Sequence, residues 1–119
     1  MTLFEEIHLL KKEIEQILND NKAAEIKTIN LKGKTSIADF MIIASGSSSK
    51  HIQALSEILL DELIKRGVEN CRLEGRNSND WKLIDAADII IHIFHPEKRK
   101  FYNLEKMWSD LIPKERLTI

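Results

Sequence analysis

A glycine followed by three serines, Gly46 to Ser49, is the first stretch of this 119-residue chain whose residue types could do chemistry. Between a strand and the start of a helix, such a loop presents backbone N–H groups to a phosphate, and nucleotidyltransferases use one in this position. The same residues also make an ordinary helix cap. The loop lacks the lysine that a P-loop requires, so the motif alone does not identify a nucleotide site.

Nucleotidyl transfer also needs carboxylates that converge on Mg²⁺ ions roughly 3.5 to 4 Å apart, normally an Asp-x-Asp pair on a strand. None of the expected strands has that pair. Asp85 and Asp88 are separated by an odd offset across a turn, and Glu57, Asp61 and Glu62 lie on an expected helix. The sequence therefore favours a protein that is not an enzyme, and we assign it no catalytic residue.

His92 and His95 raise the question of a metal site. Their odd offset on an extended strand points the two rings to opposite faces, and the chain has one cysteine to add, so we expect no metal and no cofactor. His92 has two further interpretations, a hydrogen-bonded histidine at the edge of the core and a neutral contact residue on a sheet face left open for a partner. The periodicity does not decide between them.

Charge gives little reason to expect nucleic-acid binding. The net charge is -1, from 18 basic and 19 acidic residues, so no global field attracts phosphate. Lys98-Arg99-Lys100 is the main basic run, and it is flanked by Glu97 and Glu105. We interpret it as a solvated helix face, with peripheral contact to RNA as the alternative.

The length and composition predict one domain over residues 1–119. The single cysteine, Cys71, cannot form an internal disulfide and is best interpreted as a small apolar strand residue in a reducing compartment. The N-terminal segment is amphipathic and interrupted by charges such as Glu5 and Lys11, unlike a signal peptide or a membrane span. We therefore expect a cytoplasmic protein with no membrane contact.

Hydrophobic periodicity and turn residues predict the elements that position these side chains. Helices are expected at about 2–19, where Thr2 and Glu5 form a capping box, at 49–66 before Gly67, as a turn from Pro96, and at 103–112 before Pro113. Strands are expected at about 26–31, 40–44, 71–73, 81–84 and 88–94.

The most apolar strand, Ile89 to Phe94, indicates how the sheet is built. Ile89, Ile91 and Ile93 share one face and Ile90, His92 and Phe94 the other, which is typical of a central strand. The run 40–44 is expected to be a second central strand, and the short 85–88 link makes its two flanking strands antiparallel. The fold class is α/β: one mixed sheet of about five strands with flanking helices, including a βαβ unit around helix 49–66.

Trp81 and Leu83 share a face of their strand. If that face is the side of the sheet without helices, it carries an apolar patch too large for a free monomer to leave bare. The candidates to cover it are a second copy of the chain and a foreign protein, and one patch could serve both in alternation.

The stretch from Trp81 to Trp108, with the turn 36–40 and the loop 43–51, resembles the Iojap-related family, the bacterial ribosomal silencing factors. The resemblance covers nearly the whole chain. It implies a nucleotidyltransferase-like topology and a factor that binds the large ribosomal subunit at its protein numbered fourteen, sterically blocking the small subunit and repressing translation. A large-subunit assembly factor would use the same surface, and a nucleotidyltransferase-like enzyme is the remaining alternative.

Carried over residue by residue, the resemblance implies a contact region in which acids and a hydroxyl meet basic groups of the partner and a tryptophan supplies apolar area. Its members are Trp81, Lys82, Asp85, Asp88, His92, His95, Tyr102 and Glu105. Asp39 and the residues 45–51 also match, and we interpret them as structural. Ala87 stands where the family usually has a glycine before the second acid, which leaves the turn geometry to be determined.

Overall fold

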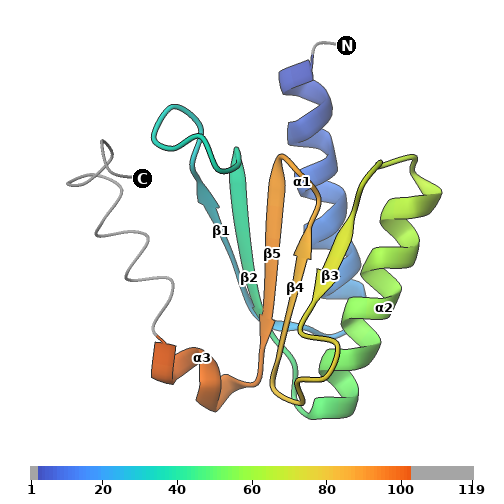
Figure 1. The fold of residues 1–119 in the computed structure, drawn as a ribbon, viewed down its shortest axis with the longest axis vertical. Helices are drawn as coiled ribbons and strands as arrows, with labels where there is room; N and C mark the ends of the chain where they lie inside the picture. Colours follow the sequence, from blue (N-terminus) through green and yellow to red (C-terminus); the bar gives the residue numbers. More distant parts are fainter. Residues whose placement is uncertain (1–2, 103–119) are drawn as a thin grey trace.

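The structure is a computed structural model that describes residues 3–102, with the backbone alone at 100–102. Its elements follow one another as α1 (Leu3–Asp20), β1 (Ala24–Asn30), β2 (Phe40–Ser45), α2 (Ser49–Lys65), β3 (Arg72–Glu74), β4 (Trp81–Asp85), β5 (Ile89–Phe94) and α3 (Pro96–Tyr102) (Figure 1). Every expected element up to Tyr102 is present within a few residues of its predicted bounds. The expected helix 103–112 and Glu105 lie outside the described residues.

The five strands form one mixed sheet in the order β1-β2-β5-β4-β3. β2 and β5 pair in parallel, while the pairs β1–β2, β4–β5 and β3–β4 are antiparallel. The central position of β5, the inner position of β2 and the antiparallel β4–β5 pair are all confirmed. β3 runs parallel to β2, so β2, α2 and β3 form the predicted βαβ unit, with β5 and β4 between its two strands.

Helices α1 and α2 lie side by side on one face of the sheet (Figure 1). Their apolar stripes, including Ile14, Leu18 and Leu59, pack on the inward residues of β5, Ile89 and Ile91, and all five side chains are fully buried. Each such side chain stabilises the fold by about 1.5–3 kcal/mol relative to an exposed one. The main core therefore lies between the sheet and these two helices.

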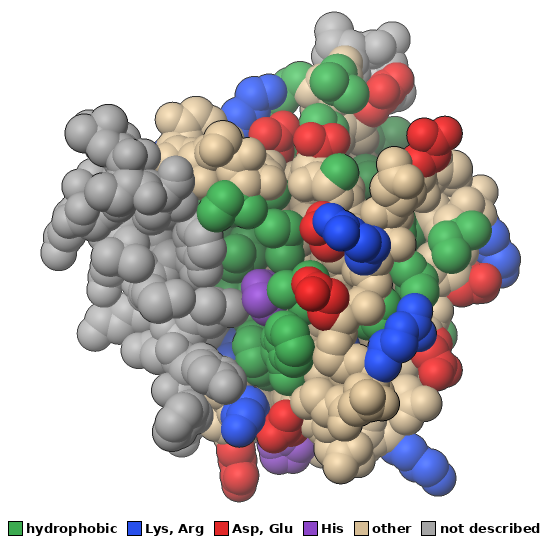
Figure 2. Space-filling model, viewed as in Figure 1, with side chains coloured by type: hydrophobic (Ala, Val, Ile, Leu, Met, Phe, Trp, Pro, Cys, Tyr) green, Lys and Arg blue, Asp and Glu red, His purple; other side chains and the backbone are tan. Residues whose placement is uncertain are grey.

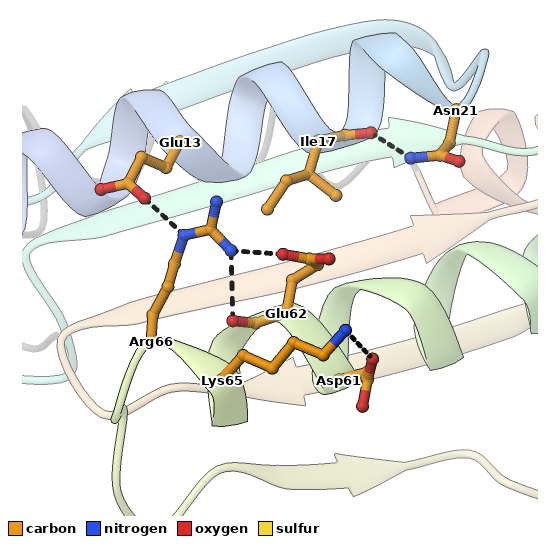
Figure 3. A network of polar contacts seen from close by, with 7 residues as sticks. All are labelled: Glu13, Ile17, Asn21, Asp61, Glu62, Lys65 and Arg66. Carbon is orange, nitrogen blue, oxygen red and sulfur yellow. Dashed lines mark hydrogen bonds and ion pairs between the residues drawn. The ribbon is translucent and has the colours of Figure 1, made fainter.

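Charged side chains join the exposed sides of the two helices (Figure 3). Arg66, which follows α2, donates to Glu13 on α1 and to Glu62 on α2, and Lys65 pairs with Asp61 at 3.1 Å. Asp61 and Lys65, like Glu62 and Arg66, are four residues apart, a spacing at which opposite charges on a helix meet. Because exposed pairs of this kind contribute only about 0.3–0.5 kcal/mol each, they orient the helices while the apolar core holds them.

The turn between β4 and β5 explains the role of Ala87. This residue has a φ of 67°, in the left-handed region, and its amide donates to Asp85 Oδ1 at 2.9 Å. Asp88 then directs its carbonyl to the amides of Asp39 and Phe40, at 2.8 and 3.2 Å. A glycine would adopt this φ without strain, whereas alanine bears a cost. The turn keeps both acids in place despite the alanine.

None of the helices within residues 3–102 is long and apolar enough to span a membrane.

Replacing Ala87 by glycine should raise the free energy of unfolding by about 0.5–1 kcal/mol, because relief of left-handed strain exceeds the added entropy of the unfolded chain. The matched control is Ala86→Gly. Ala86 is buried and has no positive φ, so its replacement should destabilise the protein. Urea unfolding followed by circular dichroism measures both changes, and a destabilised A87G variant would contradict the strain argument.

Candidate protein-binding surface

The sheet face opposite α1 and α2, here called the second face, carries a continuous apolar centre. Strand register brings together on it Met41 and Ile43 of β2, Ile90, His92 and Phe94 of β5, and Trp81 and Leu83 of β4. Figure 2 shows hydrophobic side chains gathered over the middle of the sheet, with acidic and basic side chains around them. Trp81, Leu83 and Ile90 are half-buried, whereas Met41, Ile43 and Phe94 are buried; the apolar side chains left partly open to water are therefore those of β4 and Ile90.

Trp81 and His92 are joined within this centre. The indole Nε1–H of Trp81 donates to His92 Nδ1 at 3.4 Å, and the imidazole stacks on Phe94 with ring centroids 5.7 Å apart. Burial lowers the pKa of His92 to about 4. Because an indole nitrogen only donates, Nδ1 must accept, which also requires a neutral ring. His92 is therefore a neutral, hydrogen-bonded histidine, which fits both of its interpretations, and its contact with a partner stays a prediction.

The position of Trp81 depends on Gly75, a glycine to which sequence reasoning gave no role. Gly75 has a φ of 82°, and a Cβ on it would lie 2.7 Å from the Trp81 carbonyl oxygen and 2.9 Å from the indole Cε3. Any other residue would both strain the backbone and push the indole away. The available signal was a glycine opening a polar turn six residues before a tryptophan.

Lys82 fixes the loop between β3 and β4, which contains Gly75, from the interior of the protein. Its ammonium donates to the carbonyls of Gly75, Arg76 and Ser78 at 2.7, 2.9 and 2.6 Å, and the residue is only 4% exposed. Neighbouring strand residues point to opposite faces, so Lys82 lies on the side away from Trp81. All three of its N–H donors are satisfied within the chain. We therefore assign Lys82 to positioning the loop and leave it out of the proposed contact set.

The two predicted acids lie at the other end of β4. Asp85 belongs to the second face, where Arg72 of β3 stands opposite it with 3.6 Å between Arg72 Nη2 and Asp85 Oδ2. Asp88 is exposed on the turn. Trp81 and Asp85 are four residues apart on an extended strand, hence about 13 Å. The predicted contact residues of β4 thus span the sheet, aromatic at one end and acidic at the other.

His95 and Tyr102 belong to the segment that follows β5. The His95 amide donates to the Asp80 carbonyl at 2.9 Å, and its Nδ1 accepts from the Glu97 amide at 3.4 Å, so this residue starts α3 and fixes it near Trp81. Tyr102 is the last residue of α3. The side chain of Tyr102 lies outside the described part of the structure, as does Glu105.

One residue of the basic run on α3, Arg99, differs from the predicted solvated face. Arg99 is only 5% exposed, and its guanidinium donates to the buried Ser45 hydroxyl at 2.8 Å. The Nζ of Lys98 lies 3.7 Å from Asp80 Oδ2. Arg99 thus ties α3 to the end of β2, because a buried guanidinium must satisfy its donors within the protein.

The loop at Gly46 is organised as a cap. The amides of Gly46, Ser47 and His51 donate to the Phe94 carbonyl, His51 Nδ1 and Ser48 Oγ at 3.0, 2.9 and 3.1 Å. A Cβ on Gly46 would lie 2.7 Å from Ile52 Cγ1. The glycine therefore lets α2 pack closely, and three of the amides at this loop already have acceptors within the chain.

Ser47 and His51 also resemble a nucleophile and its base. The Ser47 hydroxyl lies 3.1 Å from His51 Nδ1, and His51 Nε2 lies 2.9 Å from the Asn21 carbonyl oxygen, which orients the ring. The same Nδ1 accepts from the Ser47 amide at the shorter distance of 2.9 Å. Because Nδ1 has one lone pair, the amide occupies it and the hydroxyl is not activated.

Comparison with known proteins shows similarity over most of the chain. Residues 5–118 match the model of the family described as ribosomal silencing factor during starvation. The chain is 49% identical to a ribosomal silencing factor of Zymomonas mobilis, over 85% of its own length and 76% of the relative's. It is 30% identical to the mouse protein named mitochondrial assembly of ribosomal large subunit protein 1, covering 78% of this chain and 42% of that one.

Solved structures agree with the fold. A crystal structure from Chromobacterium violaceum superposes with a TM-score of 0.81 at 30% identity, covering 92% of this chain and 88% of the other. A second, from Bacillus halodurans, has a TM-score of 0.76 at 36% identity and covers 85% and 94%. The predicted fold class is confirmed, and the matched sequence, from residue 5 to residue 118, shows that this protein belongs to the ribosomal silencing factor family.

Proposed function

We propose that this protein binds the large ribosomal subunit through the ribosomal protein numbered fourteen and keeps the small subunit from joining. The observation that carries the proposal is the second face, where half-buried Trp81, Leu83 and Ile90 surround a neutral His92. An apolar centre with an aromatic anchor and a polar rim is the usual anatomy of a protein interface. The relatives named ribosomal silencing factors support the ribosome as the partner.

The charge pattern of this surface favours contact with a protein that carries basic side chains. Asp85 and Asp88 lie at one end of the apolar centre, where Arg72 at the edge of the sheet is the cation beside Asp85, and Lys82 is buried on the other side. We assign the contacts to Trp81, Asp85, Asp88 and His92, with His95, Tyr102 and Glu105 continuing them. Contact with ribosomal RNA is peripheral in this arrangement.

The proposed mechanism is steric, with no bond made or broken. A domain docked on the intersubunit face occupies space that the small subunit needs, so joining is blocked while the domain stays bound. By mass action, repression lasts only as long as the concentration and affinity of the factor outcompete joining. The proposed place of action is the cytoplasm, where ribosomes meet their factors.

The second face has a further proposed use in the free protein. We infer that two copies associate through it and separate when the ribosomal partner docks, because either partner would remove the apolar area of half-buried Trp81, Leu83 and Ile90 from water. An assembly role is the second candidate function. Its support is the name of the mouse relative, which refers to assembly of the large subunit, and timing of binding separates the two roles.

Sedimentation on a gradient tests the proposal directly. Purified protein mixed with large subunits, small subunits or whole ribosomes should migrate with large subunits alone, and rejoining of subunits should fall in the same mixtures. Binding to large subunits without loss of joining would favour the assembly role. Absence of binding would contradict both and return attention to the Gly46 loop, for which titration with nucleoside triphosphates and Mg²⁺ is the measurement.

Replacing Trp81 by aspartate should abolish both self-association and binding to large subunits, because it places a charge in the apolar centre. Loss of a buried aromatic anchor typically costs about 2 kcal/mol or more, at least a 30-fold drop in affinity. The control is Ile64→Asp, a change at an exposed apolar residue of α2 outside the second face. Light scattering and co-sedimentation measure the two properties; a W81D protein that retains both would refute this surface.

Stability should fall as the pH drops from about 6.5 to 4, because the unfolded chain protonates His92 at its ordinary pKa of 6.5 while burial keeps it neutral in the fold until about 4. The contribution lost by pH 5 is about 2 kcal/mol. A His92→Gln variant, which still offers the indole an acceptor, should lose this part of the pH dependence. Urea unfolding of both proteins at pH 5 and 7.5 measures the free energy of unfolding at each pH. An equal change in that free energy between the two pH values in both proteins would contradict the prediction.

A further inference from the structure

A groove lies beside the acidic end of the second face, between the start of β3, the β4–β5 turn and the loop before β2. Its volume is about 730 Å³, within the range of sites that bind a ligand or a short chain segment. Ile37, Ala87 and Ile90 give it apolar walls, and Ile37 is 49% exposed. The charged side chains in its lining are Arg72 and Asp85.

These two charges face each other across the β3–β4 pair. Arg72 stands directly opposite Asp85 in the strand register, and 3.6 Å separates Arg72 Nη2 from Asp85 Oδ2. The Arg72 side chain is 78% exposed and that of Asp85 is 32% exposed. A separation of 3.6 Å exceeds that of a hydrogen-bonded ion pair, which is about 2.7–2.9 Å. The pair is therefore loose, with the cation at the edge of the sheet and the carboxylate at the groove.

Asp85 is the better held of the two. Its Oδ1 accepts from the Ala87 amide at 2.9 Å, which fixes the carboxylate in the turn and directs Oδ2 toward Arg72. Arg72 instead has a long side chain on the edge strand of the sheet, exposed to water. An incoming group would therefore meet a fixed carboxylate and a movable guanidinium.

We propose that a basic side chain, carried on an apolar segment of the protein partner, enters this groove and displaces Arg72 from Asp85. Two cations at one carboxylate oxygen repel each other, and the repulsion grows when docking excludes water. The fixed carboxylate stays and the exposed guanidinium leaves. Arg72 is thus an internal competitor that weakens docking and rejects partners without a cation at this position.

The choice of occupant follows from charge complementarity and from continuity with the proposed interface. Asp85 belongs to both the groove and the second face, so a partner that covers Trp81 and Leu83 also reaches it. The apolar walls suit the aliphatic part of a lysine or arginine, whose charged end would reach Oδ2. This inference rests on the proposed function and adds the chemistry of one contact to it.

The test is a titration of N-terminally labelled protein with purified large ribosomal subunits, followed by fluorescence anisotropy at low salt. The label avoids Cys71, which lines the groove. Arg72→Gln should tighten binding about two- to fivefold, the range expected from releasing one exposed ion pair. Asp85→Asn should weaken it at least tenfold, because the partner's cation loses its carboxylate while the Asn side chain still accepts from Ala87.

The double variant makes the experiment decisive. If Arg72 acts through Asp85, Arg72→Gln should change binding little in the Asp85→Asn background. Arg76→Gln is the matched control, because it removes one positive charge from a nearby exposed residue and should leave affinity within twofold. The advantage of Arg72→Gln should also shrink as salt rises.

The outcomes separate this inference from the proposed function. Absence of wild-type binding overturns the proposed function and this inference with it. Wild-type binding that Arg72→Gln weakens or leaves unchanged overturns the inference alone, because Arg72 is then a contact residue or irrelevant. An equal gain from Arg76→Gln would also overturn it, since the effect would come from net charge.

Discussion

The parallel pairing of β2 with β5 is the constraint on which the rest of the structure depends. These two strands are apolar on both faces, so each must be covered twice, once by α1 and α2 and once on the second face. Alternation along β5 then fixes what each face receives: Ile89, Ile91 and Ile93 face the helices, and His92 faces away from them. The second face is a consequence of building the sheet around two strands that are largely apolar on both sides.

The buried ammonium of Lys82 helps to position the end of the second face that carries Trp81. The hydrogen-bond acceptors of the Lys82 ammonium are three backbone carbonyls of the loop before β4 rather than a carboxylate. Desolvating a charge is costly unless its donors are satisfied, so the loop and the lysine stabilise each other. Gly75 completes the arrangement by leaving room for the indole of Trp81. The hydrogen bonds of Lys82 on one side of β4 thus help to position Trp81 on the other side.

Sequence reasoning predicted what short-range patterns determine. The apolar run of β5, the short β4–β5 link and the serine cap of α2 are local features, and all three match the structure. The burial of Arg99 was not predictable, because its partner Ser45 is 54 residues away and only the folded sheet brings them together. The burial of Lys82 was not predicted either, although its three carbonyl partners lie only four to seven residues away. A long charged side chain has no periodicity that reveals its destination.

The loop at Gly46 shows how one local motif can serve chemistry or packing, depending on where its amides are directed. A phosphate site needs several N–H groups aimed at an open space. Here the amides of Gly46, Ser47 and His51 are bonded within the chain, and the space beside the glycine is filled by Ile52. One of these hydrogen bonds, from the Gly46 amide to the Phe94 carbonyl, joins the loop to the end of β5, and the other two form the cap of α2. A cap that is already formed in the free protein loses little conformational freedom when a partner docks, which supports the proposed steric mechanism.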